Sequence, residues 1–374
     1  MQPSITTVPL LQLASGDRLS LQTYRFVGAE PGKKAYLQAN LHGAELAGNA
    51  VLHQLMAWLM SLEETALRGE IWLVPVCNPL GVNQRATHFA SGRFNPYDGK
   101  DWNRIFWDYE TESEDILAFA QSQLNLDTMS IQQNYRQRIQ TRFAALAEQL
   151  NTSAGVPFGD RYRYQLQSFC LDADYIIDLH TSSDQGLTYL YYFRGREDSA
   201  ALFSLPAGIL LDQYDGDAFD EAFIKPWLAL EDCFASLGRS LQFDIEAWTL
   251  ELGSAMQLDP ESVASGLQGV KQYLAHKGLL ASDQGSAPMP AQTMRLVSRS
   301  QVKRYYSPVG GMIQARVPLG TQVTAGQRIY QVLQFNKDGT LPIVVEVYAE
   351  TEGLVFDVAI NQAVNEGEYV LGIM

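Results

Sequence analysis

Two histidines and a glutamate have the types and the spacing that could hold a metal ion. His42 and Glu45 lie three residues apart in "NLHGAELAGN", directly after an apolar run, and His180 ends another apolar run in "IIDLHTSS". Catalytic zinc usually takes three protein ligands, two of them from a short spacer and the third from a distant part of the chain. The three residues therefore predict a site for one zinc ion per subunit.

The His-x-x-Glu spacing alone does not separate a metal site from the start of a helix. A glutamate in the first turn of a helix interacts favourably with the helix dipole, so Glu45 also fits that structural role. Asp178 strengthens the metal interpretation, because it lies two residues before His180 and alternation along a strand places both side chains on the same face. A carboxylate beside a ligating imidazole is its usual outer partner. A structural histidine remains the alternative for His180.

Short apolar segments lead into these polar residues and predict the elements that position them. A strand, a helix and a second strand follow one another, which predicts a βαβ unit and a mostly parallel, mixed sheet flanked by helices, an α/β fold. Polar residues at the carboxyl ends of such strands meet in one crevice, and His42, His180 and Glu251 all fall there. The predicted strands are 34–40, 69–79, 173–182 and 245–254, and the predicted helices of this part are 44–64 and 261–280.

Three further regions differ from this pattern. A catalytic domain is predicted over 1–282, with a helical insertion at about 107–168 whose apolar residues recur at spacings of three and four. A structural role for the insertion is favoured over a substrate lid or a subunit contact. Residues 283–294 are rich in Ser, Gly, Pro and Ala and predict a linker. Residues 295–374 form two similar halves of short β runs and glycine turns, which resemble a barrel-sandwich hybrid domain.

The charge of the chain argues against nucleic acid and anionic membranes as binding partners. The formal net charge is −15 and the pI is near 4.8, whereas nucleic acid and anionic membranes both require a basic face. Cys77, Cys170 and Cys233 lie far apart without a Cys-x-x-Cys spacing and predict reduced thiols. Neither a signal-peptide pattern nor an apolar segment of about 18 residues is found in the sequence. We therefore expect a cytoplasmic protein that acts on a small molecule.

Four ordered motifs resemble the succinylglutamate desuccinylase/aspartoacylase family, whose members are relatives of the zinc carboxypeptidases. "NLHGAELAGN" is similar to the family's His-Gly-x-Glu metal motif, and "NPLGVNQRATHFASGRFNPYDGKDWNR" to its segment from Asn-Pro to Asn-Arg. "DLHTS" is similar to the segment with the third metal ligand, and "WTLELGS" to the strand with the catalytic glutamate. The resemblance covers roughly residues 20–106 and 170–280 and extends to the C-terminal β domain. It implies a zinc-carboxypeptidase-like fold.

The resemblance also implies an activity. His42, Glu45 and His180 would bind zinc, and Glu251 would act as general base and then as general acid. Zinc lowers the pKa of water, and a nearby carboxylate can take the proton and return it to a leaving nitrogen. The expected reaction is hydrolysis of the amide bond of an N-acyl amino acid or a related small amide, a non-peptide C–N bond.

The long second motif supplies the substrate contacts that the resemblance implies. Arg93 would polarise the scissile carbonyl, while Asn103 and Arg104 would hold a substrate carboxylate, to which a guanidinium fork is suited. Arg85 competes with Arg93, because its loop is close in sequence. Trp102 replaces the leucine that the family has before Asn-Arg, and the usual Phe-Pro-Gly after it is missing, so we expect a pocket of different shape.

Other polar residues are weaker candidates. Glu246 lies five residues before Glu251 and therefore points to the other face of the sheet. His53 falls in the first helix and His276 in the last turn of another, where a cation offsets the dipole. His88 lies in the loop before Arg93 and is a candidate for the pocket wall. None of these three histidines is expected to bind a metal.

Other functions stay open. A metallocarboxypeptidase acting on short peptides would use the same residues. A carrier or binding protein would need a modified lysine in the β domain, where Lys303 and Lys337 are available, although the Met-Lys-Met context of biotin carriers is absent. A pseudoenzyme would keep the fold without its activity. The β domain is expected to pack against the catalytic domain, where it narrows the mouth of the pocket or forms a subunit interface. Its Val and Ile strands could add to a neighbouring chain, which predicts a homo-oligomer.

Overall fold

A nine-stranded mixed sheet forms the centre of the computed structural model, which describes the chain except residues 87–89, 113–114, 149, 151–154, 215 and 282–293. The strands lie in the order β1-β2-β4-β3-β5-β9-β7-β8-β10. Their bounds are β1 (Ser4–Gln12), β2 (Arg18–Val27), β3 (Glu30–Ala39), β4 (Arg68–Val74), β5 (Tyr175–Ser182), β7 (Thr188–Tyr192), β8 (Ala207–Leu210), β9 (Glu246–Ser254) and β10 (Arg295–Ser298).

The central strands of this sheet are parallel. β3 pairs in parallel with β4 and β5, and β5 pairs in parallel with β9. The pairs β1–β2, β2–β4 and β7–β9 are antiparallel, which makes the sheet mixed. Because both faces of a parallel sheet are covered, the residues of β5 and β9 are buried along almost the whole length of each strand, rather than on one face only. The predicted α/β fold is confirmed.

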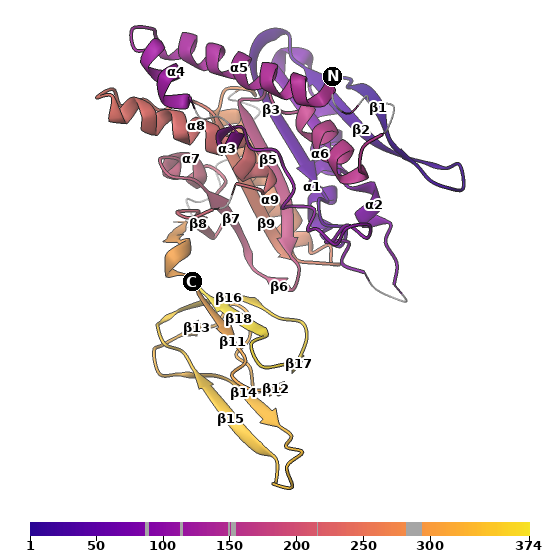
Figure 1. Ribbon diagram of the computed structural model, residues 1–374, viewed down its shortest axis with the longest axis vertical. Coiled ribbons are helices and arrows are strands. Elements are labelled where there is room, and N and C mark those ends of the chain that lie inside the picture. The colour runs from indigo at the N-terminus through magenta and orange to yellow at the C-terminus, as the bar shows by residue number, and fades with distance from the viewer. Residues whose placement is uncertain (87–89, 113–114, 149, 151–154, 215, 282–293) are drawn as a thin grey trace.

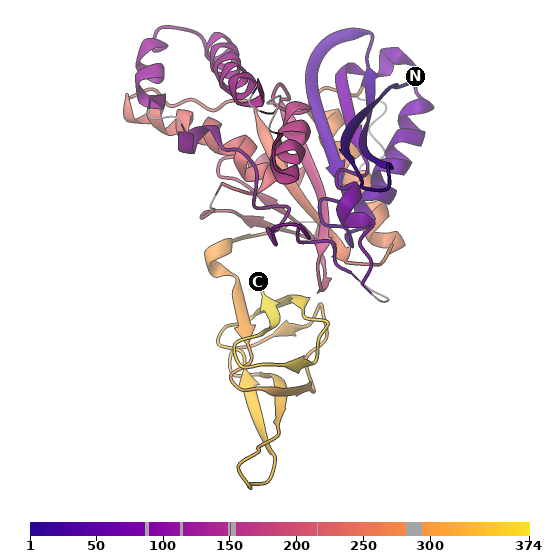
Figure 2. The ribbon, with the colours of Figure 1, turned by 45° about the vertical axis from the view of Figure 1, so that its right-hand side comes forward.

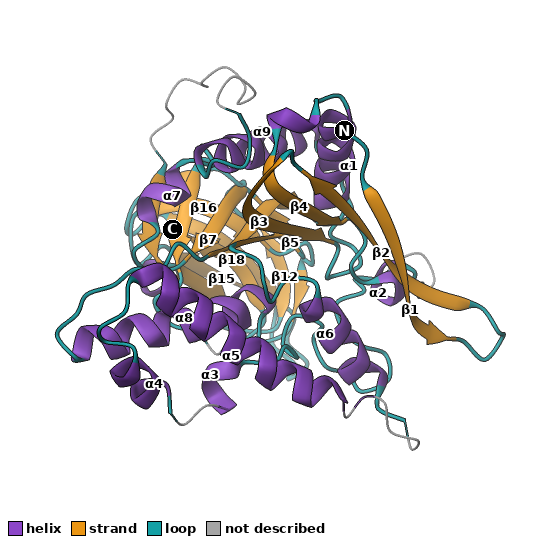
Figure 3. Cartoon of the chain, turned by 90° about the horizontal axis from the view of Figure 1, so that it is seen from above, coloured by secondary structure: helices purple, strands orange, loops and turns teal. Residues whose placement is uncertain are grey.

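Helices cover both faces of the sheet (Figure 3). On one face lie α1 (Ala47–Met60) and α9 (Pro260–His276), and on the other lies α8 (Phe219–Ser236) with the insertion outside it. The apolar stripe of α1 packs on the sheet through buried residues at spacings of three and four: Val51, Leu52, Leu55 and Leu59. Asp259 caps α9, since its carboxylate accepts a hydrogen bond from Ser262 N at 2.8 Å.

The region predicted as a helical insertion contains four helices in its described part, of which α4 and α5 lie above α8 in Figure 1. They are α3 (Tyr109–Glu112), α4 (Ile116–Ser122), α5 (Thr128–Glu148) and α6 (Phe158–Ser168). The apolar stripe of α5 is buried in the core, where Tyr135 packs edge-on against Trp227 of α8. The insertion therefore extends the core on this face. Short helical segments elsewhere are α2 (Pro79–Val82), α7 (Glu197–Ala201) and 3₁₀ turns at Glu64–Ala66 and Arg299–Gln301.

The C-terminal residues form two small antiparallel sheets below the large one (Figures 1 and 2). One contains β11 (Lys303–Tyr306), β18 (Tyr369–Ile373), β16 (Gly353–Val358) and β13 (Gln322–Val323), and the other β15 (Ile343–Tyr348), β14 (Arg328–Gln334), β12 (Gly311–Gln314) and β17 (Ala363–Val364). The predicted all-β region is confirmed. The short strand β6 (Gln185–Gly186), just after β5, pairs with β16 and joins the two parts of the molecule.

The exact domain limits stay a prediction. β10 pairs in parallel with β8, so the predicted range 295–374 begins with a strand of the large sheet. The predicted linker, 283–294, lies outside the described residues except for its last position. Cys77, Cys170 and Cys233 are all free thiols. Among the helices of the described chain, none has the length and apolar character that a membrane span needs.

Gly48 fixes how closely α1 lies on the sheet. A Cβ atom at this position would lie 2.6 Å from Leu179 Cβ and 2.8 Å from Ala39 Cβ. We predict that Gly48→Ala lowers the free energy of unfolding by about 1–3 kcal/mol, because the helix must move away from β3 and β5. Urea unfolding followed by circular dichroism measures this.

Gly159→Ala is the matched control. Gly159 lies in α6, and a Cβ atom there would meet only ordinary contacts at 3.7 Å and 3.8 Å. Since alanine has the higher helix propensity, this variant should be as stable as the wild type or slightly more stable. Equal stability of both variants would contradict the close approach of α1.

Candidate active site

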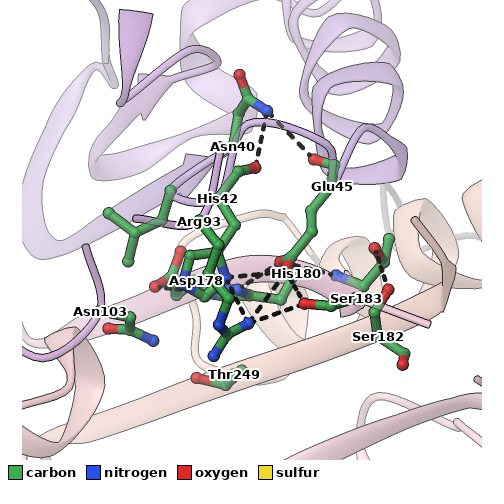
Figure 4. A network of polar contacts seen from close by, with 12 residues as sticks. Asn40, His42, Glu45, Arg93, Asn103, Asp178, His180, Ser182, Ser183 and Thr249 are labelled. Carbon is green, nitrogen blue, oxygen red and sulfur yellow. Dashed lines mark hydrogen bonds and ion pairs between the residues drawn. The ribbon is translucent and has the colours of Figure 1, made fainter. Parts of the chain in front are cut away.

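The candidate site lies where β3, β5 and β9 end, on the face of the sheet that α8 covers. Between β5 and β9, Asp178 pairs with Thr249 and His180 with Glu251 in register, so these four side chains form two neighbouring rows. Asn40 directly follows β3 with a positive φ of 71°, which asparagine tolerates better than most residues. Its amide donates to Gly43 O at 3.0 Å, to His42 O at 3.1 Å and to Glu45 O at 3.4 Å and fixes the turn that presents His42; Figure 4 shows the contacts with His42 and Glu45.

His42, Glu45 and His180 converge as the sequence predicts (Figure 4). Glu45 lies between the two imidazoles, with His42 Nδ1 2.8 Å from Glu45 Oε1 and His180 Nδ1 2.8 Å from Glu45 Oε2. One ligand atom from each residue lies within 4.8 Å of the others, and all three side chains are buried. Burial alone would raise the pKa of the Glu45 carboxyl, but the two imidazoles hold it well below its usual range.

Carboxylates hold the outer nitrogens of both imidazoles. His180 Nε2 lies 2.9 Å from Asp178 Oδ2, and His42 Nε2 lies 3.0 Å from Asp101 Oδ1. Because a carboxylate only accepts hydrogen bonds, each neutral imidazole carries its hydrogen on Nε2 and keeps a lone pair on Nδ1. The Nδ1 atoms of neutral His42 and His180 and the Glu45 carboxylate can then be ligands of one cation. Without a cation, burial lowers the pKa of His180, but Asp178 and Glu45 outweigh it and raise this pKa well above its usual value, which favours a proton between His180 and Glu45. The donor set fits a divalent metal ion.

Arg93 lies beside this group and is fixed from two sides. Its Nη1 donates to Ser183 Oγ at 2.8 Å, and its Nε lies 2.9 Å from Asp101 Oδ2. The competing residue, Arg85, is exposed, donates to the carbonyl oxygens of Val82 and Gln84, and is not among the residues that line the cavity beside the metal group. The geometry therefore favours Arg93 over Arg85 as the arginine beside the metal group.

Glu251 has the surroundings of a proton-transfer group. Its carboxyl has no hydrogen-bond partner in the described part of the chain, and its Oε2 is buried. Burial, chiefly, raises its pKa to about 8. A carboxyl whose pKa is near neutral can both take up and release a proton. Glu246 lies on the opposite face as predicted, where it accepts hydrogen bonds from Tyr273, Ser199 and Lys277.

Asn103 and Arg104 line the same cavity as the metal group. Asn103 Oδ1 accepts a hydrogen bond from Phe219 N, at the start of α8, at 2.8 Å. Its amide nitrogen is therefore turned away from the helix and has no acceptor among the described residues. Trp102 beside it is fully buried and packs against Tyr162 of α6, with ring centroids 5.0 Å apart. Trp102, which is larger than the leucine that the family has at this position, thus packs against a helix of the insertion.

The cavity has a volume of about 320 Å³ and two walls. The sheet and its loops form one, and the small β sheets form the other. The small sheets contribute Arg304, Tyr306, Phe356, Asp357 and Tyr369 to this wall, and the 3₁₀ turn before them contributes Arg299. Asp357 accepts hydrogen bonds from Ser182, the last residue of β5, and from Tyr369 Oη. These contacts attach the β wall to the strand that carries His180.

Sequence reasoning missed several of these residues. Asp101 lies in the motif that runs from Asn-Pro to Asn-Arg, but the sequence analysis gave it no role. Its position two residues before Asn103 could have marked it as a site residue. Ser183 carried no signal, and although the β domain was expected to narrow the pocket mouth or form a subunit interface, the sequence did not indicate which of its residues line the cavity. His53 and His276 are exposed and distant from the metal group, in agreement with the sequence, whereas His88 lies outside the described residues. Lys303 and Lys337 are exposed on the small sheets.

Comparison with known proteins agrees with this geometry. A family model for the succinylglutamate desuccinylase/aspartoacylase catalytic domain matches residues 31–277, more than half of the chain. The chain belongs to the succinylglutamate desuccinylase/aspartoacylase family. The family prediction from the four sequence motifs is confirmed.

Relatives in this family share the whole architecture. A family protein of known structure from Shewanella amazonensis is 32% identical, with a TM-score of 0.86 over 99% of this chain and 98% of its own. Another from Shewanella frigidimarina is 29% identical, with a TM-score of 0.87 over 100% and 97%. An N-alpha-acetyl-L-2,4-diaminobutyric acid deacetylase from Halomonas elongata is 23% identical over 91% of this chain and 81% of its own. The two structures include the C-terminal sheets.

Asp101 should control metal affinity, because it fixes the hydrogen of His42 on Nε2. We predict that Asp101→Asn weakens binding of Zn²⁺, used as the probe, by about 10–100-fold. Competition with a chromogenic chelator measures this affinity. Asp98→Asn, an exposed position in the same loop, is the control and should bind Zn²⁺ as the wild type does. Equal affinities of the two variants would show that Asp101 has no part in the metal site.

Proposed function

We propose that the protein is a zinc-dependent deacylase that hydrolyses the amide bond of an N-acyl amino acid or a related small amide. Membership of a family of deacylases supports this, and so does the activity named for the Halomonas relative. The observation that carries it is the single cavity in which His42, Glu45 and His180 meet Arg93 and an unpartnered Glu251. Each group that amide hydrolysis needs is present there.

His42, Glu45 and His180 would hold the zinc ion, with Asp178 and Asp101 orienting the two imidazoles. Zinc, when bound, supplies a Lewis acid that polarises a carbonyl group and makes water more acidic. The two histidines and one carboxylate are a ligand set that suits zinc. They leave one side of the group open to the cavity, which is where the substrate would enter.

Arg93 and Glu251 would perform the remaining steps. Arg93, held by Asp101 and Ser183, places a fixed positive charge where the carbonyl oxygen becomes negative, so little reorganisation is needed during the reaction. Glu251 takes the proton of the attacking water and returns it to the leaving amide nitrogen. An unpaired carboxyl with a pKa near 8 suits both halves of this transfer.

Asn103 and Arg104 would bind the substrate carboxylate. Asn103 is anchored through its oxygen to Phe219 N, which leaves the two hydrogens of its amide nitrogen for an acceptor in the cavity. Arg104 adds a permanent charge in a planar fork that matches a carboxylate. We also propose that the enzyme works in the cytoplasm, since its three cysteines are free thiols, and that it forms a homo-oligomer through its β strands.

An assay of N-acyl amino acids beside dipeptides of the same residues tests this function. The proposal expects the N-acyl amino acids to be hydrolysed with the higher kcat/KM. A preference for dipeptides would instead identify a metallocarboxypeptidase. Turnover of neither class by the zinc-loaded protein would contradict both.

Glu251→Gln should separate catalysis from metal binding. The amide keeps the shape of the side chain but cannot accept a proton, so we predict that kcat falls by about 10²–10⁴-fold. The zinc content, measured by atomic absorption, should not change, because Glu251 is not a ligand. Glu261→Gln, on the exposed start of α9, is the control and should keep wild-type kcat. A Glu251→Gln variant with kcat within about threefold of the wild type would exclude Glu251 as the proton shuttle.

A further inference from the structure

The segment between β5 and β7 carries Ser183, the residue that holds the outer end of the Arg93 side chain. Asp101 binds Nε of Arg93, whereas Ser183 Oγ accepts a hydrogen bond from its Nη1 at 2.8 Å. The same hydroxyl donates to Glu45 Oε1 at 3.3 Å and so joins Arg93 to the metal group (Figure 4). The position of Ser183 therefore decides where the charge of Arg93 lies in the cavity.

Ser183 itself does not pair with the large sheet. β5 ends one residue earlier, at Ser182, and among the described residues the main-chain nitrogen and oxygen of Ser183 form no backbone hydrogen bond. The position of Ser183 therefore depends on how its two chain neighbours, Ser182 and Asp184, are held.

The small sheets hold both of these neighbours. Ser182 Oγ accepts a hydrogen bond from Asp184 N at 3.1 Å and donates to the Asp357 carboxylate of β16. Asp184 Oδ1 accepts a hydrogen bond from Ile360 N, two residues after the same strand, at 3.0 Å. The other oxygen of Asp357 accepts one from Tyr369 Oη of β18 at 2.6 Å. Asp357 thus connects this bend of the chain to two strands of the small sheets.

The main chain strengthens this connection. β6 pairs with β16, and Gly186 lies opposite Asp357 in register. The contact continues where Leu187 N donates to Phe356 O at 2.9 Å. The segments approach closely because position 186 has no side chain: a Cβ atom there would lie 2.7 Å from Ser182 Cβ and 3.4 Å from Asp357 Oδ2. The glycine thus brings the Asp357 carboxylate within reach of Ser182 Oγ.

We propose that Asp357 is a positioning residue for Arg93 and acts through the bend at Ser183, so that the small sheets place the arginine as well as forming a wall of the cavity. Asp357 lines the cavity too, but both of its oxygens already accept hydrogen bonds from side chains of the protein. This favours positioning over a direct substrate contact. The inference rests on the proposed deacylase function for its effect on catalysis.

The kinetics of Asp357→Ala test the inference. Arg93 stabilises charge that develops in the transition state, so a displaced Arg93 lowers kcat more than it weakens substrate binding. We predict that Asp357→Ala lowers kcat by about tenfold or more and changes KM by less than about threefold. Asp338→Ala makes the same substitution in the exposed connection between β14 and β15 and is the matched control. It should keep the kcat and KM of the wild type.

A double-mutant cycle with Ser183→Ala separates positioning from a direct substrate contact. If Asp357 acts through Ser183, its substitution has little further effect once the Ser183 hydroxyl is gone. In the Ser183→Ala background, Asp357→Ala should therefore lower kcat by less than about threefold. A larger loss in this background would overturn the inference. An Asp357→Ala variant with the kcat of Asp338→Ala would do so too.

Chemical modification of Arg93 tests the same connection without an assay of activity. Phenylglyoxal reacts with arginine side chains, and mass spectrometry of the digested protein measures the rate at Arg93. Loss of the hydrogen bond to Ser183 frees the guanidinium, so this rate should rise by about threefold or more in Asp357→Ala and in Ser183→Ala. In Asp338→Ala the rate should equal that of the wild type.

The two measurements separate the inference from the proposed function. If no N-acyl amino acid is hydrolysed but Arg93 reacts faster in Asp357→Ala, the deacylase function fails while the positioning role stands. An unchanged rate at Arg93 in folded Asp357→Ala would reject the positioning role whatever the enzyme hydrolyses. If circular dichroism shows that Asp357→Ala does not fold, Ser182→Ala replaces it in both experiments, because it removes the same hydrogen bond from the side of β5.

Discussion

The Glu45 carboxylate, placed between the Nδ1 atoms of His42 and His180, is the constraint on which the rest of the site depends. Asp101 and Asp178 turn the imidazoles so that their lone pairs face this carboxylate. The three groups together offer the ligand atoms for one cation, and the parallel strands β3 and β5 bring them together from positions 135 residues apart. The cavity, Arg93 and Glu251 are all arranged around this point.

Much of this was predictable because it rests on local sequence. Apolar runs ending in His42, His180 and Glu251 identify strands of a parallel sheet, and the ends of such strands lie at one edge. Strand alternation correctly placed Asp178 beside His180 and turned Glu246 to the opposite face. The substrate contacts were predicted from family motifs, since nothing in their local pattern distinguishes Arg93 from Arg85.

The remaining features depend on contacts between distant segments. Asp101, the carboxylate that contacts the outer nitrogen of His42, lies 59 residues away in the sequence, in an irregular loop. Hydrophobic periodicity does not predict the course of such a loop. The β wall contacts the end of β5 through Asp357 and Ser182. The sequence predicted that the β domain narrows the pocket mouth or forms a subunit interface, but neither the strand pattern nor the composition indicated which of its residues reach the cavity. The sequence did not single out Asp220 and Glu221, which line the cavity from the start of α8. Only the fold turns them into the cavity.

Zinc analysis of the wild type and of His180→Ala tests the central claim most directly. Both proteins are loaded with zinc, dialysed and analysed for metal per chain, with His276→Ala as a control at an exposed histidine. The account predicts one zinc ion per chain in the wild type and the control and none in His180→Ala, because two remaining ligands do not retain the ion. Undiminished zinc in His180→Ala would contradict the proposed metal site.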